Sequence, residues 1–221
     1  ITPVLNGENY IRRNIESIKN LTIPFEHIIV DGGSTDGTLD VIKEYSHLKL
    51  VHQIDNKGMY AAINQGFECA RGDYFCYVNS DDELVSNNFE LLYEIISDES
   101  LDLIYSNANI YSEGVNKQNV FRCRRFPKYF LKRGFMPFVQ PSSIFSRNMF
   151  YRVNMFNSKE FRIIGDLDFF QRIAMVPKSK IRRVNLVATN FYVYANSLGN
   201  SNSNLHPIEC NKLEHRPKYS L

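Results

Sequence analysis

The sequence lacks three features that would each assign it to a class at once. It has no run of about 18 apolar residues and no charged-then-apolar leader, so we expect a soluble chain without a membrane-spanning helix or signal peptide. Its four cysteines show no CxxC spacing, so we expect free thiols in a reducing compartment. No GxGxxG string follows the first expected strand, which argues against a dinucleotide-dependent oxidoreductase.

Length and charge indicate one domain with no nucleic-acid partner. The chain has 221 residues, 43% hydrophobic and 23% charged, which suits a single globular core. The formal net charge of +2 is too small to attract nucleic acid by bulk electrostatics. We expect a domain over residues 1–195, with halves at 1–100 and 101–195, and a partly ordered tail at 196–221. Because Ile1 stands where a strand is already under way, we expect the natural chain to start earlier.

The first hundred residues alternate short apolar runs with segments of helical period. This pattern is typical of parallel strands joined by crossover helices, and it predicts an α/β fold with an open sheet. The expected strands are 2–5, 27–30, 48–52 and 74–78, and the expected helices are 10–19, 39–45 and 59–70. Asp36 stands where the second helix needs an N-cap. Further on we expect helices at 89–96 and 167–174 and strands at 103–106, 109–112 and 186–194.

Acidic residues follow three of the expected strands, where open α/β sheets bind their ligands. After the second strand, Asp31 can accept hydrogen bonds from a base or ribose, whereas Ser34 and Asp36 read equally well as turn and cap residues. After the third strand, Asp55 and Lys57 could meet a base and a phosphate, or form a solvated turn.

The loop after the fourth strand reads Asn79, Ser80, Asp81, Asp82. Adjacent acids repel each other unless a cation lies between them, and Mg²⁺ and Mn²⁺ favour carboxylate and phosphate oxygens. The loop is therefore a candidate metal site that bridges the protein to a diphosphate. By itself the same string could also cap the next segment.

The order of these loops resembles family 2 glycosyltransferases of the GT-A fold, of the polysaccharide-biosynthesis type. The resemblance rests on Pro-Val-Leu-Asn at 3–6, on Ile-Ile-Val-Asp-Gly-Gly-Ser-Thr-Asp-Gly-Thr at 28–38 and on Asn-Ser-Asp-Asp at 79–82. It implies an open, mostly parallel sheet flanked by helices, with a Rossmann-like nucleotide-binding half and a smaller acceptor-side half. It covers the first half of the chain and continues more faintly to about residue 175.

The resemblance also implies roles for single residues on the donor side. Asp31 would hold uracil or another base, with help from Asp55. Asn79 and Asp81 occupy the Asp-x-Asp positions, so Asp81 would bind Mn²⁺ or Mg²⁺ and Asn79 would contact ribose or a metal-bound water. The further residues of the expected nucleotide-sugar site are Pro3, Asn6, Ser34, Lys57 and Ser80, with Asp82 as a neighbour of unassigned role.

Residues 161–168 resemble the stretch in which this family places its catalytic base, at the start of a helix. Asp166 matches the base. Asp168 lies two residues further on, so it points elsewhere on a helix and is expected to be structural.

The resemblance weakens on the acceptor side. Residues 137–142, with Gln140, resemble a segment that lines the acceptor and donor sugar, but Val139 stands where many relatives carry His. Ala61 replaces an acid that some relatives place after a tyrosine, so Tyr60 and Ala61 receive no role here.

The implied reaction is inverting glycosyl transfer from a UDP-sugar or related donor to a glycan or lipid-linked hydroxyl. Asp166 would take the acceptor proton, and the metal on Asp81 would balance the charge of the departing diphosphate. We expect a cytoplasmic protein that works at the inner face of the membrane. The basic and aromatic segment 121–133 would touch an anionic bilayer, form a solvated helix face beside the site or contact the diphosphate.

Two other functions compete with this one. Asn79, Val139 and Ala61 depart from the family pattern, which allows an eroded nucleotide-sugar-binding protein; the acids Asp31, Asp81 and Asp166 argue against erosion. A nucleotidyltransferase would need a Gly-rich loop with Lys or Arg after the first strand, where this chain has Asn-Gly-Glu-Asn at 6–9.

Overall fold

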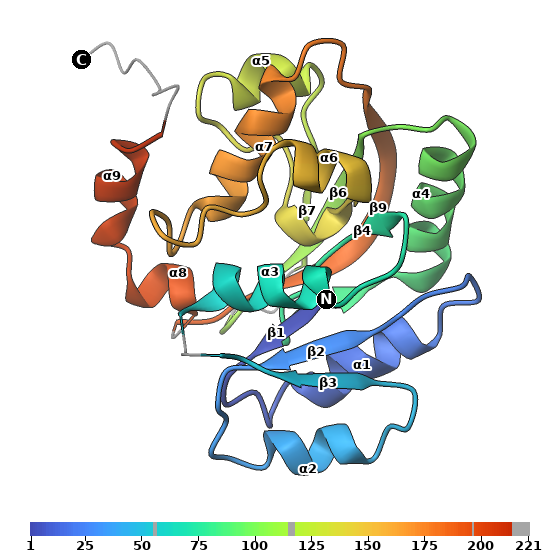
Figure 1. The fold of residues 1–221 in the computed structure, drawn as a ribbon, viewed down its shortest axis with the longest axis vertical. Coiled ribbons are helices and arrows are strands. Elements are labelled where there is room, and N and C mark those ends of the chain that lie inside the picture. Colours follow the sequence, from blue (N-terminus) through green and yellow to red (C-terminus); the bar gives the residue numbers. More distant parts are fainter. Residues whose placement is uncertain (55–56, 115–117, 196, 214–221) are drawn as a thin grey trace.

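The computed structural model describes residues 1–54, 57–114, 118–195 and 197–213. Strands and helices alternate through the first part, as expected (Figure 1). In order they are β1 (Thr2–Val4), α1 (Ile11–Lys19), β2 (Ile28–Asp31), α2 (Thr38–Lys43), β3 (Lys49–His52), α3 (Met59–Glu68) and β4 (Tyr74–Phe75).

The second part mixes longer strands with short helices. The elements are β5 (Glu83–Leu84), α4 (Ser86–Asp98), β6 (Leu103–Ser112), β7 (Asn119–Phe121), α5 (Pro127–Leu131), the 3-10 turn η1 (Gln140–Ser142), β8 (Ser143–Ser146), α6 (Arg147–Arg152), α7 (Gly165–Met175), β9 (Ile181–Val193), α8 (Leu198–Ser201) and α9 (Leu205–Cys210). In the described residues, no helix is long and apolar enough to cross a bilayer.

The strands form a parallel sheet and a mixed one. Strands β1, β2 and β3 pair in parallel with β2 in the middle. The larger sheet has the order β4-β8-β6-β9-β5, with β7 beside β6, and in it β6 and β9 are parallel while the other pairs are antiparallel. The α/β class is confirmed, but the expected mostly parallel pairing holds only for β1, β2 and β3 and for the pair of β6 with β9. The link between β6 and β7 is too short for the crossover that parallel strands need.

Backbone hydrogen bonds join the two sheets beside β1. The Ile1 nitrogen donates to the Cys76 carbonyl at 2.8 Å, and the Val78 N–H donates to the Ile1 carbonyl at 2.9 Å. The strand expected at 74–78 therefore runs beside β1, although only its first two residues form the ladder with β8. As a result the loops that follow β1 and Val78 lie together: a Cβ on Gly7 would come within 3.3 Å of the Ser80 hydroxyl.

Several element boundaries differ from expectation. The strands expected at 103–106 and 109–112 are one strand, β6, with an irregular register near Asn107. Strand β9 starts at Ile181, five residues before the expected 186, because Arg182 and Arg183 hid the strand pattern. The N-cap of α2 is Gly37 and not Asp36, although the Asp36 carboxylate still accepts the Thr38 N–H at 3.0 Å.

The end of the described chain packs onto the domain. The Asn/Ser-rich composition predicts partial order for the tail 196–221; its described residues 197–213 form α8 and α9, and the rest lies outside the described residues. Leu213 joins the main hydrophobic core, and Glu209 is buried. Two buried residues within a polar stretch do not produce a helical pattern of hydrophobic residues. The sequence therefore did not indicate that this segment packs onto the domain.

An aromatic cluster fills the centre of the domain. Phe145 on β8 is fully buried, with its ring centroid 4.9 Å from that of Phe169 on α7 and 5.6 Å from that of Phe67 on α3. These contacts hold α3 and α7 together over the face of β8 from which Phe145 projects. The helices that carry Tyr60 and Asp166 are thereby held in a fixed relation.

Replacing Phe145 with Ala should lower the free energy of unfolding by about 3–5 kcal/mol, because it opens a cavity at the junction of α3, α7 and β8. Urea titration followed by circular dichroism would measure the loss. The matched control is Leu91→Ala on α4, whose side chain is exposed, with an expected change within about 0.5 kcal/mol. Equal effects of the two variants would contradict this account of the core.

Candidate functional site

The loops after β1 and β2 are tied together by side chain to backbone hydrogen bonds. The Asn6 N–H donates to the Ser34 hydroxyl at 2.9 Å, and the Asn6 carbonyl oxygen of the side chain accepts the Thr35 N–H at 2.8 Å. Next to them, the Gly7 N–H donates to the Thr38 hydroxyl at 2.8 Å. Asn6 has φ of 52°, a left-handed conformation that asparagine tolerates better than most residues. The expected site residues Asn6 and Ser34 thus meet, and each holds the other in place.

Asp31 ends β2 and is almost fully buried. Its carboxylate accepts the N–H of Gly33 at 3.0 Å and of Ser34 at 3.2 Å, so much of its capacity orders its own loop. Gly33 has φ of 94°, which only glycine adopts readily, and this conformation turns its N–H back onto the carboxylate. The residue stands at the strand end as expected, and its contact with a base stays a prediction.

The Asn79–Asp82 loop closes on itself, with the Asp82 N–H donating to the Asn79 carbonyl at 3.0 Å, and it is also held from α1. The Asn14 amide nitrogen donates to the carbonyl oxygens of Asn79 and Asp82, both at 2.9 Å. Arg13 donates to the Asp81 carbonyl at 2.8 Å. Asn14 is fully buried on the apolar face of α1. Sequence reasoning missed it, although a polar residue on that face was a readable signal.

Arg13 also ties the loop to the end of β9. Its guanidinium forms an ion pair with Glu83, lies 3.7 Å from the ring centroid of Tyr192 and donates to the Tyr194 hydroxyl at 3.2 Å. The acidic loop is therefore fixed by a cluster in which Arg13 and the tyrosines of β9 and its end lie more than a hundred positions apart in the sequence. Sequence reasoning assigned none of these four residues to the site.

The two acids of this loop lie in a poor environment for negative charge. Burial raises the pKa of Asp81, and burial together with the charge of Asp81 raises the pKa of Asp82 well above its usual range. One Asp82 oxygen accepts the Tyr192 N–H at 2.9 Å. The other, like the side-chain oxygen of Asn79, is buried without a hydrogen-bond partner among the described residues. Unsatisfied buried oxygens beside paired acids fit a hard divalent cation.

Protein ligands for such a cation are few. In the part of the chain that the structure describes, no three His, Cys, Asp or Glu side chains gather as a metal cluster. An ion on Asp81, Asp82 and Asn79 would thus need oxygens from elsewhere. A bound diphosphate supplies them, and Mg²⁺ and Mn²⁺ sites often share their coordination with substrate phosphate in this way.

Asp166 lies in the first turn of α7 and contacts Tyr60 of α3. One carboxylate oxygen accepts the Leu167 N–H at 2.9 Å and the Tyr60 hydroxyl at 3.2 Å. Tyr60 also donates to the Ile163 carbonyl at 2.9 Å. Burial is the main cause that raises the pKa of Asp166, and the nearby charge of Glu209 adds to it. Tyr60, to which the sequence assigned no role, is thus a hydrogen-bond partner of the expected base. Nothing in the sequence indicated this, because a tyrosine on a buried helix face is normally interpreted as a core residue.

Tyr77 lies near both acidic centres. It is buried two residues before the Asn79–Asp82 loop, and its ring centroid is 5.5 Å from that of Phe156, which stacks on Tyr60 at 5.6 Å. Burial is the main cause that raises its pKa well above the usual range, followed by Tyr60 and the charges of Asp166 and Asp82. Both carboxylates therefore act on one phenol. The expected metal loop and the expected base, far apart in sequence, lie on the same side of the domain.

Other expected residues have structural contacts. Asp168 forms an ion pair with Arg172 at 2.7 Å, in keeping with the structural role expected for it. The Gln140 amide nitrogen donates to the Tyr77 carbonyl at 2.8 Å. Pro3 is buried in β1 opposite Val30.

The remaining residues of the expected site lie at the rim. Ser80 is half-buried and Lys57 is exposed. Asp55 lies outside the described residues.

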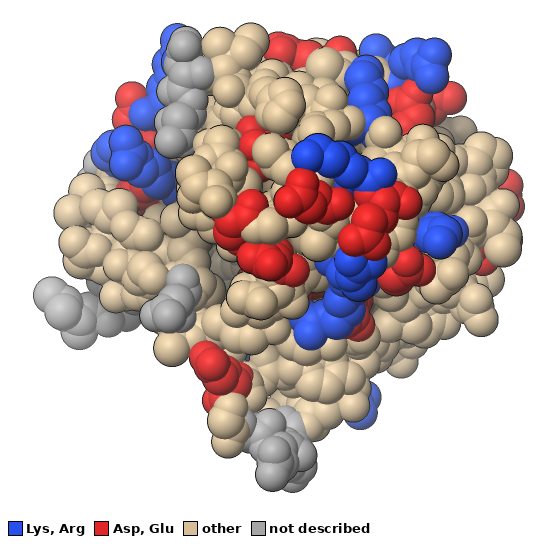
Figure 2. All heavy atoms as spheres, turned by 90° about the horizontal axis from the view of Figure 1, so that it is seen from below, with Lys and Arg blue, Asp and Glu red and all other residues tan. Residues whose placement is uncertain are grey.

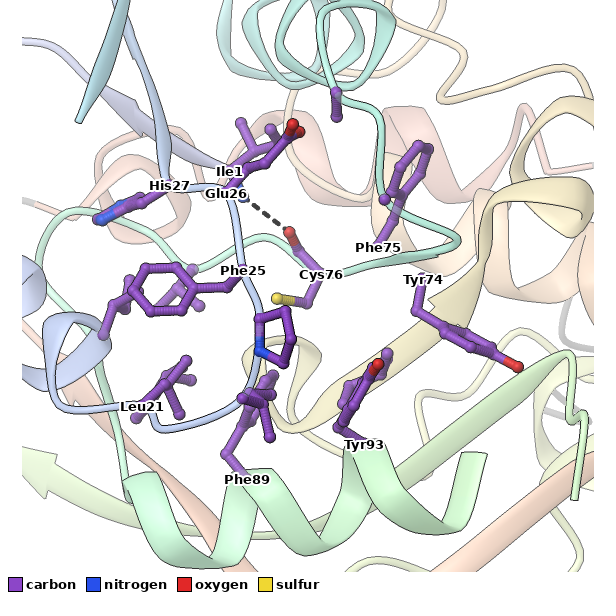
Figure 3. Close-up of a pocket in the computed structure, with 18 of the residues that line it drawn as sticks. Ile1, Leu21, Phe25, Glu26, His27, Tyr74, Phe75, Cys76, Phe89 and Tyr93 are labelled. Carbon is purple, nitrogen blue, oxygen red and sulfur yellow. Dashed lines mark hydrogen bonds between the residues drawn. The ribbon is translucent and has the colours of Figure 1, made fainter. Parts of the chain in front are cut away.

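A pocket of about 340 Å³ lies apart from these residues (Figure 3). It opens at the start of β1, β2 and β4, between Phe25 and the α4 residues Phe89 and Tyr93. Ligands of open α/β sheets bind at the carboxyl ends of the strands, and this pocket is at the amino ends. Its lining is mainly apolar and includes none of the expected site residues, so we assign it no part in the chemistry.

Comparisons with known proteins agree with this geometry. The family described as Glycosyl transferase family 2 matches residues 1–158. EpsH of Bacillus subtilis, named as a glycosyltransferase, is 37% identical over 122 residues, which is 53% of this chain and 35% of EpsH. The PGL/p-HBAD biosynthesis glycosyltransferase of Mycobacterium tuberculosis is 26% identical over 198 residues, 86% of this chain and 75% of that protein. The chain spans less than half the length of curated relatives that are 30–37% identical to it.

Solved structures share the fold at low identity. Staphylococcus aureus TarS residues 1–349 in complex with UDP superposes with a TM-score of 0.69 at 19% identity, covering 98% of this chain and 66% of that chain. The mannosyltransferase PcManGT from Pyrobaculum calidifontis, in complex with GDP-Man and Mn²⁺, gives 0.66 at 15% identity, covering 96% and 62%. The fold is therefore the GT-A fold expected from the sequence. The chain, with its strand-end acids gathered at one edge of the sheet, belongs to glycosyl transferase family 2.

Proposed function

We propose that this protein transfers a sugar from a nucleoside-diphosphate sugar, UDP-linked as first choice, to a hydroxyl of a glycan or lipid-linked acceptor, with inversion at the anomeric carbon. The observation that carries the proposal is the buried Asn79–Asp82 loop, in which one oxygen each of Asn79 and Asp82 has no hydrogen-bond partner among the described residues. Such a loop would hold a charge sink for the departing diphosphate, and Asp166, which accepts the Tyr60 hydroxyl, would supply the base.

The donor side is proposed from the strand-end loops. TarS binds UDP and UDP-GlcNAc, and PcManGT binds GDP-Man with Mn²⁺. In this chain Asp31 would meet the base, Asn79 and Ser80 the ribose side, and Lys57 a phosphate. The hydrogen bond between Asn6 and Ser34 would hold the two loops that form one wall of the nucleotide site.

A divalent cation would be held by Asp81, with the unsatisfied oxygens of Asp82 and Asn79 beside it. Such an ion supplies Lewis-acid stabilisation of the departing diphosphate. Asn14 and Arg13 hold the loop by its backbone carbonyls and so leave its side chains available for the ion. Because Asn79 brings no charge, we propose that the ion binds tightly only together with the nucleotide.

Asp166 would act as the base toward the acceptor hydroxyl. The Tyr60 hydroxyl carries one proton but lies within hydrogen-bond distance of both the Ile163 carbonyl and Asp166. When Asp166 is protonated, its carboxyl can donate to the Tyr60 hydroxyl oxygen. The Tyr60 proton is then free to bond fully to the Ile163 carbonyl. Tyr60 would thus help to stabilise the protonated Asp166 that forms as the acceptor loses its proton.

The segment 121–133 favours an anionic membrane as the place of work. Its Phe126 is 75% exposed with φ of 59°, and Tyr129 is 54% exposed. No acidic residue occurs between Glu113 and Glu160, whereas the exposed residues around Phe126 include Arg122, Arg124, Arg125, Lys132 and Arg133. Aromatic rings among unbalanced basic side chains suit the headgroup region of an anionic leaflet. The cytoplasmic face of a membrane, with a lipid-linked acceptor, is the setting that we propose.

The opposite side of the molecule has a different charge pattern. Figure 2 views the side of α2, where acidic and basic side chains lie next to one another. Ion pairs such as Arg12–Glu44 and Lys43–Asp40 account for this mixture. The unbalanced charge is thus a local property of the α5 region and not of the whole surface.

A binding protein without activity is the second candidate, because Asn79, Val139 and Ala61 depart from the family pattern. The unsatisfied oxygens at Asn79 and Asp82 favour the enzyme. A site that had lost its ion would be expected to fill such positions with hydrogen-bonded or apolar groups.

Thermal shift with UDP, GDP, dTDP and CDP, each with and without Mn²⁺, should reveal one nucleotide that stabilises the protein only when the metal is present. Asp81→Ala should abolish the metal-dependent part, because the ion loses its main protein ligand. Asp40→Ala, an exposed acid on α2, is the matched control and should leave the shift unchanged. Absence of any shift in the folded protein would sink the donor-site proposal.

Asp166→Asn should lower the rate of UDP-GlcNAc or GDP-mannose hydrolysis by about 10²–10⁴-fold while nucleotide binding persists. In the wild type, activity should rise with pH, because the base must lose its proton. Since burial raises the pKa of Asp166, the rise should lie above the range of an ordinary carboxylate. Asp168→Asn is the control for a neighbouring acid on the same helix, and a full rate in Asp166→Asn would refute the base assignment.

Co-sedimentation should detect binding to vesicles of phosphatidylcholine with phosphatidylserine but not to pure phosphatidylcholine. Replacing Phe126 and Tyr129 together with Ser should reduce that binding about tenfold or more, because both rings leave the interface. Phe25→Ser, an exposed phenylalanine away from the α5 region, serves as control. Equal binding to vesicles with and without phosphatidylserine would contradict the proposal that this segment contacts an anionic membrane.

A further inference from the structure

A buried carboxylate from the end of the chain binds the turn that precedes α7. Glu209 on α9 is only 4% exposed, and its oxygens accept the N–H groups of Arg162 at 2.7 Å, Ile163 at 3.0 Å and Ile164 at 3.1 Å. Figure 1 shows α9 at the edge of the molecule, near the chain that leads into α7. Three consecutive backbone donors thus share one side chain from a distant segment.

The turn needs such a partner because its own N–H groups precede α7 and have no acceptor on the N-cap residue. The N-cap residue is Ile164, whose side chain has no oxygen; within the first turn of α7, the Asp166 carboxylate accepts the Leu167 N–H. An anion at the N-terminal end of a helix is favoured by the helix dipole. Glu209 therefore satisfies the three N–H groups just before the helix and places a negative charge at that end.

The same turn carries the contacts of Asp166. Ile163 gives its N–H to Glu209 and receives the Tyr60 hydroxyl on its carbonyl. Two residues later, Gly165 packs so closely on the Tyr60 ring that a Cβ would come within 2.6 Å of it. A shift of the turn would therefore change the distance of 3.2 Å between Tyr60 and Asp166.

We propose that Glu209 is a positioning residue for Asp166: by binding the backbone of residues 162–164 from α9, it fixes the turn that holds Asp166 against Tyr60. The role of Asp166 as a base rests on the proposed function, whereas the contacts of Glu209 with residues 162–164 are independent of it. The tail is accordingly part of the site, although it contributes no group that touches substrate.

Charge supports the same assignment. Besides Glu209, the titratable groups that act on Asp166 or respond to it are Tyr60 from α3 and Tyr77 from the segment after β4, and on α7 itself Asp168 is paired with Arg172. The charge of Glu209 raises the pKa of Asp166. Removing that charge should therefore lower the pKa of Asp166, which loss of tail packing alone would not do.

The test needs no substrate. The pKa of Asp166 is measured by carbon-13 NMR of labelled Asp carboxyls, assigned with Asp166→Asn, and amide hydrogen exchange is followed over residues 161–167. Glu209→Gln should lower the pKa of Asp166 and speed exchange at 162–164 at least tenfold, because one acceptor becomes a donor. Glu209→Asp, which keeps the charge but shortens the reach, should speed exchange and leave the pKa nearer to the wild type; it also serves if Glu209→Gln does not fold.

Leu213→Ala is the matched control, because it loosens a buried tail anchor and leaves the carboxylate in place. An unchanged pKa of Asp166 in Glu209→Gln, or the same change in Leu213→Ala, would overturn the proposal. Failure of the proposed function would show separately, as full hydrolysis of a sugar nucleotide by Asp166→Asn.

Discussion

The site depends on one arrangement: a buried acidic loop that is held mainly by its backbone rather than through its side chains. Asn14 and Arg13 donate to three carbonyl oxygens of the Asn79–Asp82 loop, and only one carboxylate oxygen of Asp82 is used, to accept the Tyr192 N–H. Burial then disfavours the ionised form of both acids. A bound cation would relieve the repulsion between the two buried acids, which is why we propose a metal site at this loop.

The second half of the domain brings the expected base to this loop. Phe145 holds α3 and α7 together, and Tyr60 and Asp166 meet across that junction. Glu209 adds a contact from the last described helix to the turn before α7. Three segments remote in sequence therefore define the position of one carboxylate. A site of this kind can keep its chemistry while its rim, where acceptor contacts lie, changes freely.

The polar rim and the buried centre obey different physical rules. Residues at the rim, such as Lys57, are exposed and can adjust to a ligand. Residues at the centre, such as Tyr77 and Asp82, are buried, and their protonation depends on their neighbours. Donor recognition by the loops and catalysis by the centre are therefore proposed on different kinds of observation: hydrogen-bonded loop geometry for the first, buried charge for the second.

The sequence alone determined the α/β class, the first strands and helices and the family, because hydrophobic period and the Asp31–Thr38 string are local signals. It also marked Asp31, Asp81 and Asp166 as acids at element ends, where burial and a ligand compete. Only the tertiary structure decided that Asn14, Tyr60 and Glu209 support the site, since each reads as core or tail until its partner is known. It also decided the mixed pairing of the second sheet and the packing of the tail. Hydrogen bonds between segments far apart in the chain leave no periodic trace in sequence, and these are the interactions that place the acids together.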